Sequence, residues 1–405
     1  MLTPAAALRR ILDRMDGLSP LPAERVALRQ ALGRALSEDL RAPRSLPPFD
    51  NSQMDGYALR AADARRAGAR LPVSLEIFAG DAPGAVLPPG SCARVFTGAP
   101  LPVGADAVEM QEEVTRRGEM AVFRRPAEAG RFVRPAGADV REGAVALPRG
   151  SLVDPAAVGL AAALGRSELA VHRRPRVAIL TTGDEIVPLD RVPAPGQIVD
   201  SNSHTLAAAA LEAGAVPLVL PLAGDERGSL RAALRAAAGA DALVTTGGVS
   251  VGEKDLVRAT LKDAGARLDL WRVALRPGKP FAFGTWDRMA VFGLPGNPTS
   301  AWVTFELFVR PALRALAGLQ GSGRLVLPAR LSRAQEKPRQ LAVYLRTRAR
   351  RVRGELWLDP LPTQQSGHLT SAVNVDALAI LPAGVSRLAG KALVEALWLR
   401  APPGG

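Results

Sequence analysis

Three unbroken aliphatic runs between residues 176 and 246 constrain the fold of this chain most strongly. The runs are RVAIL (176–180), VPLVLPL (216–222) and ALVTT (242–246). Such runs are typical of strands that are buried on both faces of a sheet. Segments with a helical pattern alternate with them, at 203–213, 226–238 and 253–264. This alternation predicts a parallel sheet with right-handed helical crossovers.

The segments on either side of this region have different patterns. Helices are predicted over 4–16, 22–36 and 151–165. Between about residues 50 and 150, short alternating apolar runs separated by Gly and Pro predict a β-rich insert. The run MAVFGLPGN (289–297) leads into a long helix predicted over 299–317. After Gly321, short alternating segments predict a small terminal β domain, with strands near 324–333, 341–352 and 392–399.

The composition excludes several kinds of site. Of 405 residues, 47% are apolar and 22% are charged, as in folded globular chains. The single cysteine, Cys92, excludes a disulfide framework and a zinc site made of cysteines. His172, His204 and His368 lie far apart and form no HExxH pair, so a histidine-based metal site is not predicted either.

The net charge of +13 suggests nucleic acid or an anionic membrane surface as a partner. However, only five of the 52 basic residues are lysines, and the arginines are scattered without a long basic arm. The excess charge is therefore interpreted as a bias in composition, and no nucleic acid is expected as a partner.

No membrane association is expected from the hydropathy pattern. A membrane helix needs roughly 18 consecutive apolar residues. The most apolar stretch, 205–223, is interrupted by Glu212, Pro217 and Pro221. The N-terminus carries no secretory signal pattern, so we expect a cytoplasmic protein.

Loops rich in glycine and hydroxyl groups follow three of the predicted strands, at 181–185, 246–255 and 293–300. In an open α/β sheet, ligands bind beyond the carboxyl ends of the strands. Glycine lets backbone N–H groups approach an anion, and the helix that follows presents its positive end. Neither the G-x-G-x-x-G nor the P-loop spacing is present. One such loop could be a plain tight turn. Three in one sheet indicate an anion-binding site, with these candidates: Thr182, Gly183, Gly247, Gly248, Ser250 and Asn297.

Acidic and basic residues gather near the same loops. Glu185, Asp225 and Asp255 each follow a predicted strand. Carboxylates that converge near phosphates usually hold Mg²⁺, so these three are candidate metal ligands, although Asp255 could instead cap the next helix. The segment from Arg272 to Lys279 is rigid and positively charged.

Eight motifs follow one another along the chain: PPFDNSQMDGYALR, VFTGAP, LTTGDEIV, DSNSHTL, TTGGVSVGEKD, RPGKPFAFG, GLPGNPTSAW and SGHLTSAVNVDAL. Together they closely resemble the MoeA family of molybdopterin molybdenumtransferases. The gephyrin E domain of animals and its plant counterpart are similar. The match runs nearly end to end, and the combination of MDGYA with TTGGVSVG, PGKP and LPGNP is highly specific.

The resemblance implies an α/β multidomain fold and a subunit that pairs as a homodimer. The expected parts are an N-terminal helix segment (1–25), an elongated linker domain (26–45 and 141–173), a β-rich insert domain (46–140), a MogA-like molybdopterin-binding parallel α/β domain (174–325) and a small C-terminal β-barrel domain (326–405). The Asp55 loop of one subunit is expected to face the α/β domain of the other.

The resemblance also implies the reaction. Adenylylated molybdopterin and molybdate are the substrates, Mg²⁺ is the cofactor, and hydrolysis of the adenylyl bond accompanies molybdenum insertion to give molybdenum cofactor and AMP. The implied catalytic residues are Asp55, Thr97, Asp139, Glu185, Asp225 and Asp255. The residues implied to bind substrate are Arg134, Arg272, Arg276, Lys279, Pro295, Pro298, Arg346 and Ser371, the last two as contacts of molybdate.

One departure and three alternatives remain. The family often has lysine where Arg272 and Arg276 stand, and arginine binds anions as a planar fork instead of a point charge. The alternatives are a molybdopterin adenylyltransferase, a gephyrin-like scaffold that binds peptides, and a nucleic-acid-binding protein. The complete set of carboxylates and the lack of a long fused linker count against the scaffold. A MogA-type adenylyltransferase and molybdoenzyme acceptors are its expected protein partners.

Overall fold

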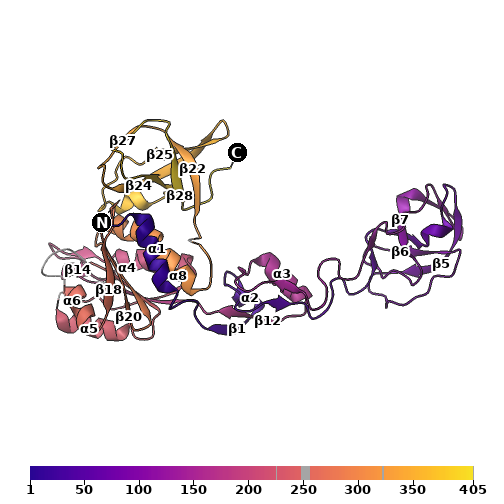
Figure 1. Ribbon diagram of the computed structural model, residues 1–405, viewed down its shortest axis with the longest axis horizontal. Coiled ribbons are helices and arrows are strands. Elements are labelled where there is room, and N and C mark those ends of the chain that lie inside the picture. Colours follow the sequence, from indigo (N-terminus) through magenta and orange to yellow (C-terminus); the bar gives the residue numbers. More distant parts are fainter. Residues whose placement is uncertain (225, 248–255, 322, 405) are drawn as a thin grey trace.

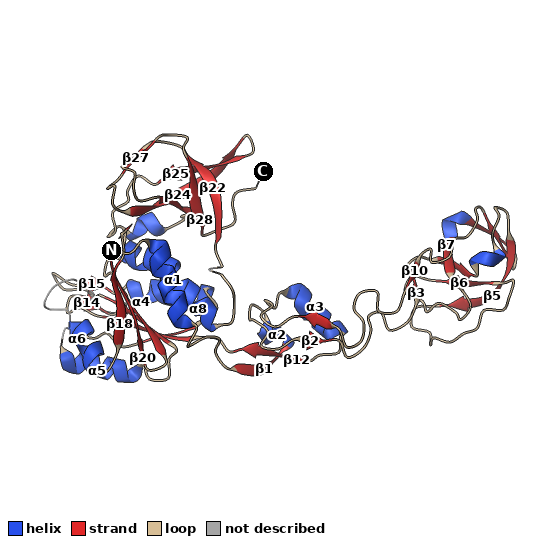
Figure 2. Ribbon diagram, viewed as in Figure 1, coloured by secondary structure: helices blue, strands red, loops and turns tan. Residues whose placement is uncertain are grey.

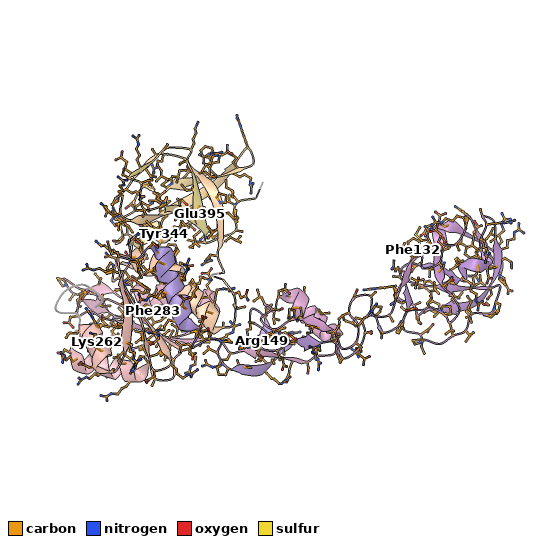
Figure 3. The ribbon with its side chains drawn as sticks, in the orientation of Figure 1. Phe132, Arg149, Lys262, Phe283, Tyr344 and Glu395 are labelled. Carbon is orange, nitrogen blue, oxygen red and sulfur yellow. The ribbon has the colours of Figure 1, made fainter. Side chains whose placement is uncertain are left out.

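The chain is drawn out into an elongated shape with folded units at both ends (Figure 1). A computed structural model describes residues 1–224, 226–247, 256–321 and 323–404. The α/β unit and the C-terminal β unit lie together at one end, the β insert lies at the other end, and a small unit connects them. Phe283 lies in the α/β unit and Phe132 in the β insert, which shows how far apart the two ends are (Figure 3).

The α/β unit is built on one mixed sheet. In spatial order its strands are β16 (Val216–Val219), β13 (Arg176–Thr181), β17 (Ala242–Thr246), β21 (Met289–Leu294), β20 (Pro280–Trp286) and β18 (Arg267–Arg272). The first four strands are parallel and the last two are antiparallel. The parallel sheet predicted from the aliphatic runs is therefore confirmed.

One detail of that prediction is wrong. We expected the run at 216–222 to be buried on both faces, but β16 is the edge strand of the sheet. Val216, Leu218 and Val219 are 42–47% exposed. Pro217 fits this position, because a proline in a strand removes a backbone donor and is tolerated mainly at an edge.

Helices cover both faces of this sheet (Figure 2). One apolar core joins the sheet to α1 (Pro4–Met15), α4 (Asn202–Glu212), α7 (Pro298–Thr304) and α8 (Arg310–Leu316). A π-helical turn, η3 (Phe305–Val309), connects α7 to α8, so the predicted long helix is continuous. The other face packs against α5 (Arg227–Ala236) and α6 (Leu256–Asp263).

The N-terminal helix forms as predicted, with Thr3 accepting a hydrogen bond from the backbone N–H of Ala6 as its cap. The helix predicted over 22–36 is wrong. Strand β1 (Ala23–Ala27) pairs antiparallel with β12 (Glu168–His172), and only Leu28–Ala31 is helical (α2). Short isolated helices are marginal in water, and pairing with a distant strand satisfies the same backbone groups.

The connecting unit combines two distant segments of the chain. Its elements are β1, α2, β2 (Leu40–Arg41), β11 (Val145–Leu147), α3 (Pro155–Ala163) and β12. Leu36 from the outgoing segment packs with Val153, Leu164 and Val171 from the returning segment in one apolar core. The chain therefore runs out to the β insert and back through the same unit.

The β insert is a six-stranded sheet, as its alternating sequence predicts. In spatial order the strands are β7 (Ala107–Met110), β4 (Gly56–Leu59), β6 (Cys92–Val95), β5 (Arg70–Ile77), β9 (Met120–Phe123) and β8 (Val114–Arg117). Short elements complete the unit: β3 (Asn51–Ser52), β10 (Val133–Arg134), η1 (Ala61–Asp63) and η2 (Gln111–Glu113). Its cores are small and rich in alanine, and they do not join the core of the α/β unit.

The C-terminal unit is a closed barrel. Strands β24 (Ala342–Val352), β25 (Glu355–Pro360), β22 (Leu325–Leu331), β28 (Leu393–Trp398) and β26 (Ala377–Leu381) pair in a ring, because β26 returns to β24. The remaining short elements are β14 (Ile186–Val187), β15 (Ile198–Val199), β19 (Leu275–Arg276), β23 (Gln335–Glu336), β27 (Arg387–Leu388) and η4 (Leu369–Ala372). Strand β19 pairs with β24 and so joins the α/β unit to the barrel.

In the part of the chain that the structure describes, no helix combines the length and the apolar character needed to cross a membrane.

Candidate active site

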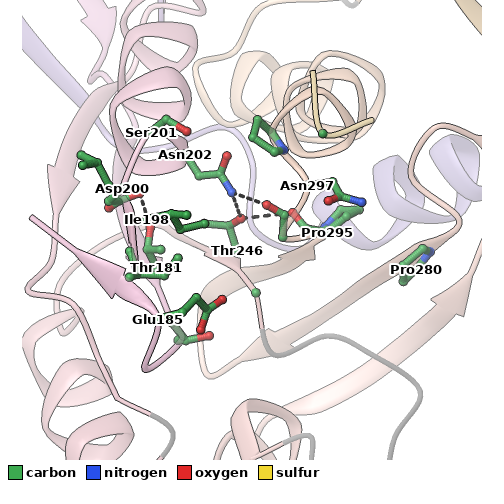
Figure 4. A pocket seen from close by; sticks show the side chains of 17 residues that line it. Thr181, Glu185, Ile198, Asp200, Ser201, Asn202, Thr246, Pro280, Pro295 and Asn297 are labelled. Carbon is green, nitrogen blue, oxygen red and sulfur yellow. Dashed lines mark hydrogen bonds between the residues drawn. The ribbon is translucent and has the colours of Figure 1, made fainter. Parts of the chain in front are cut away.

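A pocket of about 610 Å³ opens at the carboxyl ends of β13, β17 and β21 (Figure 4). This is the edge of the sheet at which ligands bind in open α/β folds. The loops after these strands supply most of the wall, and the barrel adds one residue. The lining residues are Thr181, Thr182, Glu185, Ile186, Ile198, Val199, Asp200, Ser201, Asn202, Thr246, Gly247, Pro280, Pro295, Gly296, Asn297, Pro298 and Gly367.

The side chain of Asn202 connects two of these loops (Figure 4). Its Nδ2 donates to the hydroxyl of Thr246 at 2.9 Å and to the carbonyl oxygen of Gly296 at 2.7 Å. The hydroxyl of Thr246 in turn donates to the carbonyl of Pro295 at 3.1 Å. Because a backbone carbonyl can only accept, this network fixes the orientation of the amide and the spacing between the loops.

A second buried polar side chain, Asp200, also lines the pocket. One of its carboxylate oxygens accepts from the hydroxyl of Thr181 at 3.3 Å and from the backbone N–H of Ser203 at 3.1 Å. Asp200 therefore holds the start of α4 against the end of β13. Sequence reasoning missed both Asp200 and Asn202, although the DSN triplet before a helix was a usable signal.

Close backbone contact explains why glycine occupies position 247. The backbone N–H of Thr182 donates to the carbonyl of Thr246 at 3.1 Å, so the first two loops touch. Gly247 has φ +86°, and a Cβ atom there would lie 2.6 Å from the carbonyl oxygen of Thr182. Any larger residue would therefore push the two loops apart.

The C-terminal unit reaches the pocket at Gly367, and the residue before it, Ser366, bonds to the third loop. The carbonyl oxygen of Ser366 accepts from the backbone N–H of Thr299 at 3.1 Å and from the hydroxyl of Thr299 at 2.8 Å. Its own hydroxyl accepts from Nδ2 of Asn297 at 3.0 Å. These bonds join the loop before α7 to the barrel, so the third loop and the barrel wall form a single surface.

A second cluster lies on the β insert at the far end of the molecule. Asp55 accepts hydrogen bonds at 2.8 Å from both the backbone N–H and the hydroxyl of Thr97. Arg134 donates to Asp139 at 2.6 Å. Arg134 and Thr97 also line a cavity of about 490 Å³. The structure thus gathers these predicted residues together, away from the pocket of the same chain.

Glycine is also required next to Asp55. Strand β4 runs between β6 and β7, and a Cβ atom on Gly56 would lie 2.0 Å from the carbonyl oxygen of Glu109 on β7. The glycine of the MDGYA motif therefore lets the strands approach each other directly beside the carboxylate.

Comparisons with known proteins agree with this architecture. Three family profiles match the chain in order: "MoeA N-terminal region (domain I and II)" at residues 2–165, "Probable molybdopterin binding domain" at 178–315 and "MoeA C-terminal region (domain IV)" at 328–397. Molybdopterin molybdenumtransferase from Nostoc is 37% identical over 89% of this chain and 85% of its own length. The protein of that name from Synechococcus elongatus is 36% identical over 98% and 99%.

The chain belongs to the MoeA family. A solved molybdopterin biosynthesis MoeA protein from Pyrococcus horikoshii covers 98% of this chain and 100% of its own, with a TM-score of 0.84 and 28% identity. The multidomain α/β fold expected from the sequence is thereby confirmed, including the MogA-like unit, as is an enzyme of the molybdenumtransferase family.

In this MoeA-family chain, several predicted residues line the pocket. They are Thr182, Glu185, Gly247, Pro295, Asn297 and Pro298. Gly183 leaves room for the carboxylate of Glu185, because a Cβ atom on it would lie 2.6 Å from a carboxylate oxygen of Glu185. Asp225, Gly248, Ser250 and Asp255 lie outside the described residues.

The predicted cationic segment lies beside the pocket. Arg272, Arg276 and Lys279 are exposed, and Pro280, the next residue, lines the pocket. Gly278 fits tightly under α7, since a Cβ atom on it would lie 2.3 Å from a methyl group of Thr304. The three cations therefore lie on a segment that is packed against the helix behind the pocket.

Arg346 lies beneath the pocket wall and is fully buried. Its guanidinium donates to the carbonyls of Gln365 at 3.2 Å and Thr363 at 3.4 Å, and to the hydroxyl of Thr299 at 3.4 Å. Burial lowers the pKa of Arg346 to about 10, so the side chain is still charged at neutral pH. In this arrangement it holds the loop of Ser366 and Gly367 against α7.

Ser371, the other predicted contact of molybdate, is also buried. Its hydroxyl donates to the carbonyl oxygen of His368 at 2.5 Å, within the turn that leads to η4. Both residues thus lie behind the part of the barrel wall that reaches the pocket.

The described residues of the pocket supply only part of the ligands that Mg²⁺ needs. Within the described ranges, no three His, Cys, Asp or Glu side chains lie close enough together to hold a metal ion. Mg²⁺ usually keeps several waters and binds one or two carboxylates together with substrate phosphates. Glu185 offers one such carboxylate at the pocket, so it could hold Mg²⁺ when a phosphorylated substrate supplies the other oxygens.

Proposed function

We propose that this protein takes adenylylated molybdopterin and molybdate, hydrolyses the adenylyl bond, and releases molybdenum cofactor and AMP. One observation carries the proposal. Apart from Gly367, the pocket at the carboxyl ends of three strands lies within the region that matches a probable molybdopterin-binding domain, and it combines glycine-rich loops with the carboxylate of Glu185. Loops of this kind suit phosphate groups, and an adenylylated pterin carries two of them in its anhydride.

The cations have a matching role in this proposal. Arg272, Arg276 and Lys279 would neutralise the negative charge of the phosphates and of molybdate. Glu185, with Asp225 and Asp255, would hold Mg²⁺, which supplies a Lewis acid for the phosphate oxygens when it is bound. Arg346 and Ser371 would bind molybdate after a movement of the loop that now covers them.

Asp55 and Thr97 would act on the adenylyl group. Two hydrogen bonds from Thr97 lower the pKa of Asp55, so its carboxylate stays ionised and is a weak base. Such a carboxylate is suited to orienting a water molecule by accepting a hydrogen bond from it. Arg134 and Asp139, which pair with each other nearby, would complete this half of the site.

The Asp55 cluster and the α/β pocket lie at opposite ends of the folded subunit. We therefore propose that the active form is a homodimer in which the β insert of one subunit faces the α/β pocket of the other. In a twofold dimer each contact occurs twice, which would give two equal sites. The domain divisions at 1–25, 26–45 with 141–173, 46–140, 174–325 and 326–405 belong to this proposal. A cytoplasmic location, a MogA-type adenylyltransferase as donor and molybdoenzymes as acceptors are also part of it.

The experiment is a single-turnover assay with purified protein. Adenylylated molybdopterin, molybdate and Mg²⁺ should give AMP and active molybdenum cofactor, and Glu185→Ala should abolish AMP release while the circular dichroism spectrum is unchanged. A control with ATP and free molybdopterin tests the adenylyltransferase reaction, which we expect to be absent. Consumption of ATP without AMP release from the adenylylated substrate would contradict the proposal.

A further inference from the structure

The β insert carries two aromatic rings in a stack that water can reach. Phe78 follows β5 and Phe96 follows β6, and their ring centroids are 4.7 Å apart with an interplanar angle of 10°. Phe78 is 50% exposed. Its backbone N–H donates to the carboxylate of Asp81 at 2.7 Å, which holds the turn that presents the ring.

A cation lies against this stack. The guanidinium carbon of Arg94 is 5.1 Å from the centroid of Phe96 and 5.0 Å from that of Tyr57. Arg94 also donates to the side-chain oxygen of Gln111, so its plane is held from two sides. Aromatic faces attract a guanidinium, and the combination forms a rigid surface of rings and planar charge.

This surface continues directly into the Asp55 cluster. Phe96 precedes Thr97, the residue that binds Asp55, and Arg94 contributes to the lowered pKa of Asp55 through its charge. The turn at Ala79 touches the turn at Gly98, because a Cβ atom on Gly98 would lie 3.8 Å from the Cβ of Ala79. A ligand phosphate at Asp55 would therefore have the aromatic stack beside it.

We propose that the exposed face of Phe78, with Phe96 and Arg94 stacked behind it, binds the adenine ring of the adenylylated substrate. This inference rests on the proposed function. The pterin end of that substrate belongs with the α/β pocket, which leaves the adenylyl end for the β insert. Adenine presents a planar face that stacks on phenylalanine and on guanidinium groups, as bases do on single-strand-binding surfaces. The stack would hold the leaving nucleotide while Asp55 acts on its phosphate.

The first test separates binding from chemistry in the full-length protein. Phe78→Ala should raise KM for adenylylated molybdopterin about tenfold, or about 1.4 kcal/mol, and change kcat less than twofold, because the lost ring stacks on the base and takes no part in the reaction. Phe78→Tyr should retain the KM of the wild type. Val103→Ala, which shortens another exposed side chain of the β insert, should have no effect. An unchanged KM in Phe78→Ala, with an active wild type, would overturn the inference.

A second test needs no turnover, so it remains valid if the proposed reaction is absent. Calorimetric titration should show that the wild type binds AMP more tightly than ribose 5-phosphate, and that Phe78→Ala loses this preference. A soluble pterin without the nucleotide should bind the wild type and Phe78→Ala equally. Weaker pterin binding with unchanged AMP binding would assign the stack to the pterin ring instead. A change in sedimentation coefficient in Phe78→Ala would show a subunit contact and would also overturn the inference.

Discussion

Asp55 accepts two hydrogen bonds from Thr97 on the same carboxylate oxygen, one from the backbone N–H and one from the hydroxyl, both at 2.8 Å. The backbone bond, then the hydroxyl bond and the charge of Arg94, lower the pKa of Asp55 below its ordinary value of 3.8. The carboxylate is therefore ionised at any pH at which an enzyme of this kind works. This state follows from the VFTGAP turn and not from burial, because the side chain faces solvent.

Thr97→Val should raise the pKa of Asp55 part of the way back to 3.8, since the backbone N–H still donates. A carboxyl group whose pKa is lowered on folding stabilises the fold above its unfolded pKa, and this contribution disappears as the pH falls through the folded pKa. Because the proposed reaction needs an ionised Asp55, the acid limb of AMP release should move to higher pH in the variant. Carbon-13 NMR titration of the Asp55 carboxyl measures the pKa directly, with Thr115→Val as the control. An unchanged pKa in Thr97→Val would show that the hydroxyl bond has no effect.

A mixture of two inactive variants tests the proposed dimer. Asp55→Asn and Glu185→Ala change residues at opposite ends of the folded subunit. A mixed dimer would therefore contain one intact site and one doubly defective site. Random exchange of subunits should restore about a quarter of the wild-type activity, by the twofold symmetry of the pair. AMP release before and after exchange measures the recovery. If activity stays at the level of the separate variants, each site is contained in one chain.

Gly247→Ala should lower the unfolding free energy by more than the cost of placing alanine in a left-handed backbone conformation. Gly239 is a matched control, because its φ of +81° is close to the +86° of Gly247 and no atom of the described residues lies within 4 Å of a Cβ built there. Gly239→Ala should cost about 1–2 kcal/mol of unfolding free energy for the left-handed conformation. Gly247→Ala should cost about 1–3 kcal/mol more, because of the close contact with Thr182. Urea denaturation measures both costs, and equal values would contradict the close approach of the two loops.

Two substitutions of Asn202 test whether its side chain donates the two hydrogen bonds at the pocket. Asn202→Ala leaves the buried hydroxyl of Thr246 without its donor, and removes the bond to the carbonyl of Gly296, so it should cost about 1–3 kcal/mol of unfolding free energy. Asn202→Asp keeps the shape but sets a carboxylate against the same acceptors, and should cost about 3–5 kcal/mol. Chemical denaturation ranks the two variants. A more stable Asp than Ala variant would mean that the side chain donates nothing to these two oxygens.

The thiol of Cys92 should report the opening of the β insert. It is fully buried, and burial raises its pKa from 9.0 to about 12, so the native thiol should resist alkylation at pH 8. Between pH 9 and 12 the unfolded chain loses this proton before the folded chain does, so the unfolding free energy of the β insert should fall as the pH rises. Iodoacetamide labelling followed by mass spectrometry measures the rate. Rapid native labelling at pH 8 would contradict the burial.

The sequence predicted the central sheet well, because strands buried on both faces and amphipathic helices have distinct periods. The helix expected over 22–36 failed for a physical reason: its partner strand, β12, lies more than a hundred residues later, and a local pattern contains no information about it. The aliphatic run of β16 likewise predicted a strand without indicating that it lies at the edge.

The candidate site also contains residues that could be predicted from the sequence and residues that could not. Loops after strands had to meet at one edge of a parallel sheet, so Thr182, Glu185 and Asn297 could be predicted to lie near each other. Asp200 and Asn202 could not be singled out, because their importance comes from burial and from partners on other strands. That Arg346 supports the pocket wall from beneath also depends on packing between two separate units.

The packing of α1 on α8 has a consequence for synthesis. Ile11 and Leu313 share one apolar core, although roughly 300 residues separate them, and domains generally fold as units from the N-terminus during translation. The first helix to leave the ribosome must therefore wait with its apolar face exposed until the chain has been made past Leu313. Meanwhile the β insert, whose two apolar cores draw on residues 57–133, can fold first.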